Sequence, residues 1–214
     1  IKKLYQLPAS METLDYANHL LAPFGPQLPE HRRARLLGHF VRNGASQPEE
    51  FFLSFMNFSY WGEEIDIFGN ILAALVGLSH SSRAGRMAKT VIGMRATRPF
   101  PIRVVGRPIE PDAHQWRLYM QRHRQNYPFQ YHNGGSWPFV GGFWVILLTR
   151  LGMHNQAWLE LERLAAANQE NNWEFNEWLH GESGAPLGMP GQSWNAALYV
   201  LAFLALCDRQ NFID

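Results

Sequence analysis

The sequence predicts an all-α fold built from stacked helical hairpins. Apolar residues recur at helical spacing in successive segments, and short turn signals separate these segments in pairs. Long stretches rich in proline, glycine and aromatic residues follow the pairs. Strand signals are weak, and the best short candidate is the segment 102–105. This alternation of short turns and long loops is typical of α-hairpins packed side by side.

Each predicted helix combines an apolar side with a recognisable start or stop signal. Pro23 and Gly25 end the first helix, and Asp66 starts the third, where a carboxylate meets free N–H groups. Ser81 or Ser82 is expected to cap the fourth helix. The predicted helices are residues 9–22, 29–42, 66–78, 81–94, 139–151, 155–169 and 192–208.

Two long loops are predicted, over residues 95–138 and 171–191. Long irregular segments are uncommon in domains unless they build a binding surface. Pro138 is suited to the first turn of the following helix, and Ser136 is a candidate for its cap. We therefore expect the functional side chains to lie on these loops.

Composition indicates a globular protein with a hydrophobic core, expected to form one domain over residues 1–214. Of its 214 residues 46% are apolar and 17% charged, and the net charge is +1. The basic run from His31 to Arg35 is local, so nucleic acid is not an expected partner. The longest apolar run, residues 196–206, is shorter than the roughly 20 residues of a membrane span. The protein is therefore expected to be soluble, without a membrane partner.

Cysteine and histidine usage gives no sign of a metal or cofactor. Cys207, the single cysteine, lies in an apolar run and is expected to be a small buried hydrophobic residue. The nine histidines are scattered, and neither a phosphate-binding loop nor a zinc-binding helix motif is present. With one cysteine no disulfide can form within the chain, which is consistent with a cytoplasmic protein. No signal peptide is visible, and because the chain starts with Ile1 and not with Met, it is expected to begin inside a longer polypeptide.

The loops carry two stretches whose residue types suit carbohydrate chemistry. They are Tyr131-His-Asn-Gly-Gly-Ser-Trp-Pro138 and Trp173-Glu-Phe-Asn-Glu177-Trp-Leu-His-Gly181. A carboxylate flanked by indole rings, with a glycine turn bearing His and Asn, supplies an acid or base, stacking faces and partners for hydroxyls. Glutamates beside tryptophan also occur in solvated turns, and His132 and Asn133 can equally satisfy the backbone of their own loop. Both interpretations stay open on local grounds.

Together the two stretches resemble the alkaline/neutral invertases and related bacterial glucosidases with an (α/α)6 barrel. The first stretch is close to that family's own string, and Glu177-Trp-Leu-His-Gly181 looks like its Glu-Tyr-Tyr-Asp-Gly segment. Trp194 falls where the family has an aromatic residue at the start of a helix. With weaker similarity at residues 66–70, the resemblance covers about residues 61–206. The family has Asp where this chain has His180, so contacts with substrate are expected to differ there.

The resemblance implies a helical-hairpin toroid, of which this chain would hold the C-terminal half. It implies a glycoside hydrolase that cleaves an α-glucosidic bond in a small sugar, such as sucrose or a glucosyl-glycerate-like compound, with inversion. An inverting enzyme uses a carboxylic acid and a carboxylate base about 6.5–9.5 Å apart. By resemblance Glu177 is the base, and Glu174 is the competing local choice.

The remaining expectations concern the sugar subsite and the missing acid. The residues expected to contact sugar are Tyr131, His132, Asn133, Trp137, Glu174, Trp194, Trp61 and Asp66. The family's acid is an aspartate in the first half of the barrel, and the nearby Glu63, Glu64 and Asp66 are not favoured as substitutes. The alternative is a non-catalytic carbohydrate-binding or scaffolding fragment. In either case, unpaired apolar surface predicts association with the missing half or with a second copy.

Overall fold

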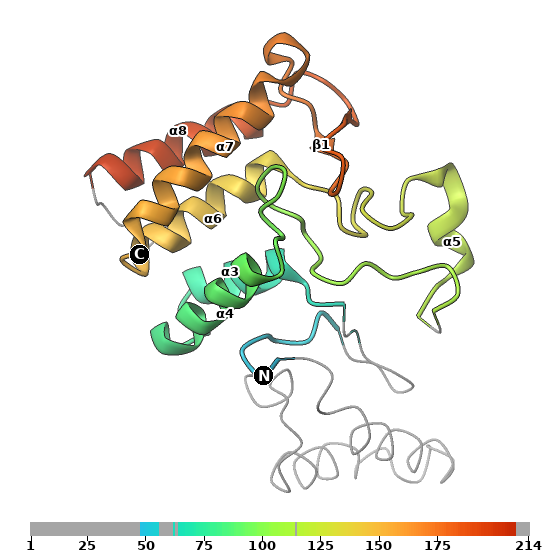
Figure 1. Cartoon of the computed structure of the whole chain (residues 1–214), viewed down its shortest axis with the longest axis horizontal. Helices are drawn as coiled ribbons and strands as arrows, with labels where there is room; N and C mark the ends of the chain where they lie inside the picture. The colour runs from blue at the N-terminus through green and yellow to red at the C-terminus, as the bar shows by residue number, and fades with distance from the viewer. Residues whose placement is uncertain (1–47, 56–61, 63, 114, 209–214) are drawn as a thin grey trace, which may run out of the picture. The chain divides into compact units, whose positions relative to one another are not determined.

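A computed structural model describes residues 48–55, 62, 64–113 and 115–208 (Figure 1). The predicted helices 9–22 and 29–42, and also Trp61, lie outside the described residues. The chain divides into a unit ending at Asp66 and a second unit beginning at Ile67, and each is described by itself. In the described part of the first unit, the Ser54 hydroxyl donates a hydrogen bond to the Glu64 carboxylate.

The second unit is mainly helical, as predicted. Its helices are α3 (Ile67–Leu75), α4 (Ser81–Gly93), α5 (Leu118–Gln121), α6 (Pro138–Arg150), α7 (His154–Trp173) and α8 (Ser193–Asp208), with a 3-10 turn η2 (Arg122–Arg124). Strands β1 (Trp178–Leu179) and β2 (Pro186–Leu187) form a short antiparallel pair. The predictions for α3, α4, α6, α7 and α8 are confirmed, whereas α5 and the strand pair were not foreseen.

Backbone angles explain why the last turn of α7 departs from the predicted end at residue 169. Asn171 and Asn172 have φ angles of 51° and 61°, in the left-handed region that asparagine tolerates better than most residues. Glu170 is extended, with ψ 144°. The regular part of the helix therefore ends close to the predicted position.

Helix α6 is the centre of the helical layer. It packs against α7, α8 and α3, and Figure 1 shows α6, α7 and α8 running side by side. Residues on every side of α6 are buried, and an apolar helix surrounded by others is the arrangement such a sequence requires. At the end of α6, the Arg150 guanidinium donates a 2.8 Å hydrogen bond to the Leu75 carbonyl, the last residue of α3.

Two adjacent glycines let other segments approach the start of α6. A Cβ on Gly142 would lie 2.7 Å from the Cβ of Leu198 in α8. A Cβ on Gly141 would lie 2.9 Å from the Pro101 carbonyl oxygen and 3.1 Å from Leu164 Cδ1 of α7. The first turn of α6 is thus held between α8 on one side and, on another, α7 and the segment that contains Pro101.

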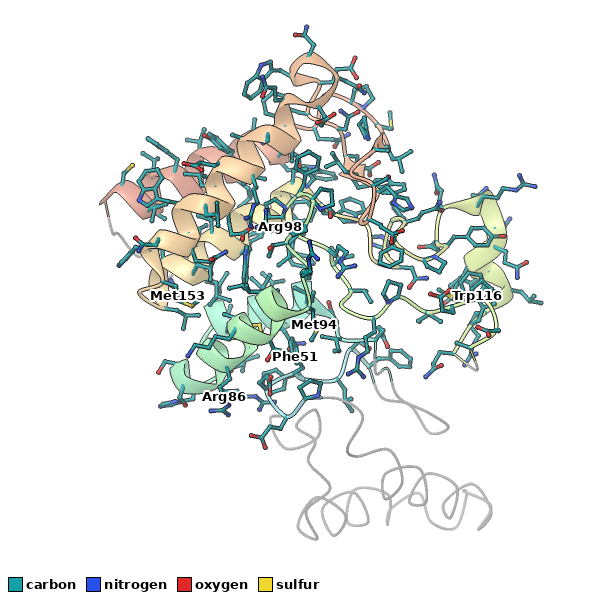
Figure 2. All side chains as sticks on the ribbon, in the orientation of Figure 1. Phe51, Arg86, Met94, Arg98, Trp116 and Met153 are labelled. Atoms are coloured by element: carbon teal, nitrogen blue, oxygen red, sulfur yellow. The ribbon has the colours of Figure 1, made fainter. Side chains whose placement is uncertain are left out.

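A buried carboxylate on α7 lies against the loop that follows α4. Glu160 accepts hydrogen bonds from Gln156 at 2.6 Å and from Arg163 at 2.7 Å. Burial raises the pKa of Glu160, and Arg163, Gln156, Thr97 and Arg98 oppose that rise. Arg98 is labelled in Figure 2, close to the helical layer. Polar contacts therefore join this loop to α7.

Several local predictions were wrong. Residues 102–105 do not form a strand, because their backbone meets the glycine turn, where Arg103 and Ser136 form a single bridge. Neither Ser81 nor Ser82 caps α4; instead His80 is the cap, and its Nδ1 accepts from the Ser82 N–H at 3.4 Å.

The third correction concerns Cys207, which is exposed and not buried. Helix α8 is apolar on all sides, but only one of its sides packs against α6 and α7. The other side carries exposed Val200, Leu201, Phe203 and Leu204. Within the described ranges, no helix combines the length and apolar character that crossing a membrane requires.

The glycine contact between α6 and α8 makes the first prediction. Gly142→Ala should lower the free energy of unfolding by about 1–3 kcal/mol, because the new methyl overpacks against Leu198. Gly85→Ala in α4 is the control, since no atom lies within 4 Å of its Cβ position, and it should stabilise by about 0.5–1 kcal/mol. Chemical denaturation measures both variants; equal stability of the two would contradict the packing described.

Candidate active site

The two stretches singled out in the sequence lie against each other. Ser136 and Leu179 exchange a pair of backbone hydrogen bonds, each 2.8 Å long. The Gly181 N–H donates a third, also 2.8 Å, to the Phe129 carbonyl. Figure 1 shows β1 beside the chain that leads into α6. The predicted juxtaposition of the glycine turn and the Glu177 segment is therefore confirmed.

Glycines make this close approach possible. A Cβ on Gly135 would lie 2.7 Å from the Tyr131 carbonyl oxygen and 3.1 Å from Trp178 Cε3. A Cβ on Gly181 would collide with the Gly134 carbonyl oxygen. Any larger residue at position 135 or 181 would push the two stretches apart.

The glycine turn is held in an unusual backbone conformation by its own hydrogen bonds. Tyr131 has a φ angle of 40°, which is costly for a residue with a bulky side chain. Its carbonyl accepts from the Gly135 N–H at 3.0 Å and from the Trp137 indole at 3.1 Å. The Phe129 N–H closes the turn on the Asn133 carbonyl at 2.9 Å. The turn therefore presents Tyr131 and His132 in a fixed orientation.

Asn133 serves the internal structure of the turn. Its side chain is 3% exposed. The amide oxygen accepts from the Ile109 N–H at 2.7 Å, and the amide nitrogen donates to the carbonyls of Ile109 and Asn126 at 2.8 and 3.0 Å. Of the two interpretations left open by the sequence, loop satisfaction therefore fits Asn133. The expectation of a direct sugar contact is not supported at this position.

Aromatic rings form a continuous series from the turn to α8, which we name the aromatic row. Its members are Tyr131, His132, Trp137, Phe139 and Trp194. The imidazole of His132 stacks on Trp137: the ring centroids are 5.2 Å apart and the planes are inclined by 2°. The ring centroid of Phe139 lies 5.9 Å from that of Trp137 and 5.6 Å from that of Trp194. Trp194 is 44% exposed, so its ring is available for stacking.

Phe139 was not foreseen as a site residue. Its signal is its position directly after Pro138, in the first turn of the helix that the glycine loop enters. Pro138 does open α6 as predicted, but the predicted Ser136 cap is wrong: the Ser136 hydroxyl donates to the Phe100 carbonyl at 3.4 Å. The Phe139 N–H is accepted at 3.1 Å by the side chain of Asn195, a second residue that the sequence analysis did not single out.

Glu177 immediately precedes β1 and is folded back onto the turn that follows β2. Its N–H donates to the Met189 carbonyl at 2.9 Å, and its Oε2 accepts from the Met189 N–H at 3.3 Å. Gly188, with a φ angle of 72°, leaves the space for this carboxylate; a Cβ there would lie 2.7 Å from Oε2. The backbone thus fixes both ends of the glutamate.

The charge of the Glu177 carboxylate acts on the His132 imidazole. Burial lowers the pKa of His132, and the Glu177 carboxylate acts in the opposite direction. A lowered pKa keeps the imidazole uncharged at neutral pH, where it can accept as well as donate a hydrogen bond. The site therefore combines a carboxylate, a neutral imidazole and several stacking faces.

Other predicted residues stand apart from this arrangement or lie beyond it. Glu174 is exposed at the end of α7, and its carbonyl accepts from the Gly191 N–H at 2.7 Å. Asp66 ends the first unit, so its role stays a prediction. His180 accepts backbone N–H groups of Glu182 and Ser183 at 3.3 and 3.2 Å, which stabilises the β1–β2 turn. Among the described residues, no three metal-ligating side chains gather.

Comparison with known proteins agrees with the resemblance of the two stretches. The family profile described as alkaline and neutral invertase matches residues 55–208. Two curated relatives from Arabidopsis thaliana are a probable alkaline/neutral invertase D, 28% identical over 111 residues, and an alkaline/neutral invertase C, mitochondrial, 31% identical over 108 residues. These matches cover 50% and 48% of this chain but 20% and 15% of the relatives.

Solved structures with a similar fold are a GH63 mannosylglycerate hydrolase from Thermus thermophilus, in two complexes. The complex with Tris and D-glycerate has a TM-score of 0.54 at 16% identity and aligns over 88% of this chain and 43% of its own. The complex with glucose has a TM-score of 0.52 at 16% identity, over 92% and 45%. The all-α, (α/α)6-barrel fold type is therefore confirmed, and the chain spans less than half of these structures' length.

The electrostatic effect of Glu177 on His132 makes the second prediction. Glu177→Gln should lower the pKa of His132 further, because it removes the negative charge that partly offsets burial. The C2 proton of His132 followed by NMR across pH 4–8 measures the shift. Glu182→Gln is the control, since the Glu182 charge acts on Arg103. A His132 pKa that rises or stays constant in Glu177→Gln would contradict this electrostatic interaction.

Proposed function

The chain belongs to the alkaline and neutral invertase family, and we propose that it supplies the base-bearing part of a glycoside hydrolase. The proposed substrate is a small sugar or glucoside with an α-glucosidic bond, and the proposed reaction inverts the anomeric centre. The observation that carries the proposal is the backbone pairing of Ser136 with Leu179, which brings the aromatic row and the Glu177 segment together.

The aromatic row suits the binding of a pyranose. Sugar rings present C–H faces that pack on aromatic planes, and their hydroxyls need donors and acceptors nearby. Trp194, which is 44% exposed, supplies a plane at the start of α8, and the His132 imidazole, backed by the buried Trp137, supplies one on the turn. The neutral imidazole of His132 supplies a donor and an acceptor for one hydroxyl.

Glu177 is the proposed general base. The Met189 N–H holds its Oε2, which leaves Oε1 to accept a proton from water. An inverting reaction also needs a carboxylic acid about 6.5–9.5 Å away, which protonates the departing oxygen. We propose that this acid is an aspartate in the other half of the barrel, where the family has its own.

The alternative function is carbohydrate binding without turnover. It keeps the aromatic row as a sugar subsite and has no general acid. Calorimetry with glucose and sucrose, run beside an activity assay on the same preparation, separates the two functions. Binding without hydrolysis by the full-length protein would favour the alternative.

The third prediction tests the base. Glu177→Gln in the full-length protein should lower kcat by about 10²–10⁴-fold on α-glucosides, because general-base catalysis contributes that much. Glucose binding should change little, since the aromatic row is intact. Glu162→Gln is the matched control, an exposed glutamate of α7 that should keep near-parental turnover. Unchanged turnover in Glu177→Gln would reject the assignment.

We also propose that the exposed side of α8 is covered by the helices that complete the barrel. This α8 outer face consists of Val200, Leu201, Phe203 and Leu204. Trp158 of α7 extends it, because its ring contacts Phe203 at 6.4 Å. An apolar surface of this kind on a soluble protein marks an interface. The similarity to a longer (α/α)6-barrel enzyme supports this occupant, and a second copy of the chain is the other occupant expected.

The fourth prediction concerns this face. Phe203→Glu in the full-length protein should lower the free energy of unfolding by about 2–4 kcal/mol, because a charge would be buried at a packed interface. Gln169→Glu, at an exposed position of α7, is the control and should stay within about 0.5 kcal/mol of the parent. Equal effects would show the face to be solvated. A loss that grows on dilution would indicate a second copy as the occupant.

A further inference from the structure

We propose that Asn195 is a positioning residue that fixes the peptide of Glu177 relative to the aromatic row. The proposal rests on the proposed function of Glu177 as the base. Asn195 lies in the first turn of α8, directly after Trp194, and its side chain is completely buried.

The carboxamide of Asn195 joins two segments that the chain keeps far apart. Its Oδ1 accepts from the Phe139 N–H at 3.1 Å, at the start of α6. Its Nδ2 donates to the Asn176 carbonyl at 2.7 Å. One amide group therefore connects the first turn of α6, the first turn of α8 and the segment that carries the glutamate.

The second of these bonds reaches the peptide unit of Glu177 itself. The Asn176 carbonyl and the Glu177 N–H belong to the same peptide bond, and the N–H donates to the Met189 carbonyl at 2.9 Å. Asn195 holds one side of this planar unit and Met189 holds the other. Rotation of the unit, which would swing the carboxylate, breaks one of the two bonds.

The first bond connects the same amide to the aromatic row. Phe139 is a member of the row, and its N–H is one of the first helical donors, which have no partner within α6. Because Trp194 directly precedes Asn195, the same first turn of α8 positions both the Asn195 amide and the Trp194 ring. The aromatic row and the Glu177 segment, which form the proposed sugar site, are thus both held by the side chain of Asn195.

Only an asparagine meets both requirements at this length. Aspartate keeps the acceptor for the Phe139 N–H, where a negative charge at a helix N-terminus is favourable. It loses the donor and places an oxygen against the Asn176 carbonyl. Asn195→Asp therefore removes the tie to Glu177 and keeps the tie to α6. A buried asparagine of α7, Asn168, provides the matched control as Asn168→Asp.

The experiment is a double-mutant cycle read at His132. The lowering of the His132 pKa caused by Glu177→Gln is measured by NMR in the parent, in Asn195→Asp and in Asn168→Asp. Because each lowering is measured within one background, the added charge of the aspartate cancels. A merely structural role would reduce stability and leave this coupling intact.

If Asn195 positions Glu177, the lowering should shrink to less than about half its parental size in Asn195→Asp and stay unchanged in Asn168→Asp. Turnover by Asn195→Asp should fall about 10–100-fold with KM changed far less, since displacements near 1 Å cost this much. Should Asn195→Asp fail to fold, Asn195→Gln moves the amide donor and acceptor one methylene further out and is read in the same way.

Parental coupling together with parental kcat in the Asn195 variant would overturn the proposal. The failure of the proposed function looks different: Glu177→Gln would then retain full turnover, whereas the coupling cycle would still report whether Asn195 holds the glutamate. The two results are therefore distinguishable in one set of proteins.

Discussion

The candidate site depends on one short piece of backbone pairing. Ser136 and Leu179 bond to each other through both of their peptide groups, so the glycine turn and the glutamate segment cannot separate without losing both bonds. Glycines at positions 135 and 181 are the condition for this contact. A side chain at 181 would collide with the Gly134 carbonyl, and one at 135 would crowd both Tyr131 in its own turn and Trp178. The arrangement of the site thus depends on two glycines, which have no side chain and take no part in the chemistry.

Around this pairing, buried asparagine side chains hold the loops and the helix starts in place by hydrogen bonds. Asn133 closes the loop on which the glycine turn sits, and Asn195 links the starts of α6 and α8 to the peptide of Glu177. A buried amide that loses its partners leaves polar groups unsatisfied at a cost of about 1–3 kcal/mol each. His132 and Trp194, two members of the aromatic row, each directly precede one of these asparagines, so the row is positioned by hydrogen bonds as well as by packing.

Helical periodicity was sufficient to predict the main helices of the second unit, since each buries an apolar face that the sequence displays. It failed for Cys207, because α8 is apolar on every side and the pattern cannot say which side is covered. The motif predicted that Glu177 and the glycine turn share a site. It did not reveal Asn195, because the two partners of its side chain are distant in the sequence. It also did not reveal the β1–β2 pair, because strands of two residues are too short to produce a recognisable sequence pattern.

A crystal structure of the full-length protein with bound glucose tests the central claim most directly. The account predicts a pyranose stacked on the aromatic row, with a hydroxyl in hydrogen-bonding distance of His132 and the Glu177 carboxylate facing the anomeric carbon across one water molecule. A sugar bound elsewhere, with Glu177 and the glycine turn outside its contacts, would contradict it.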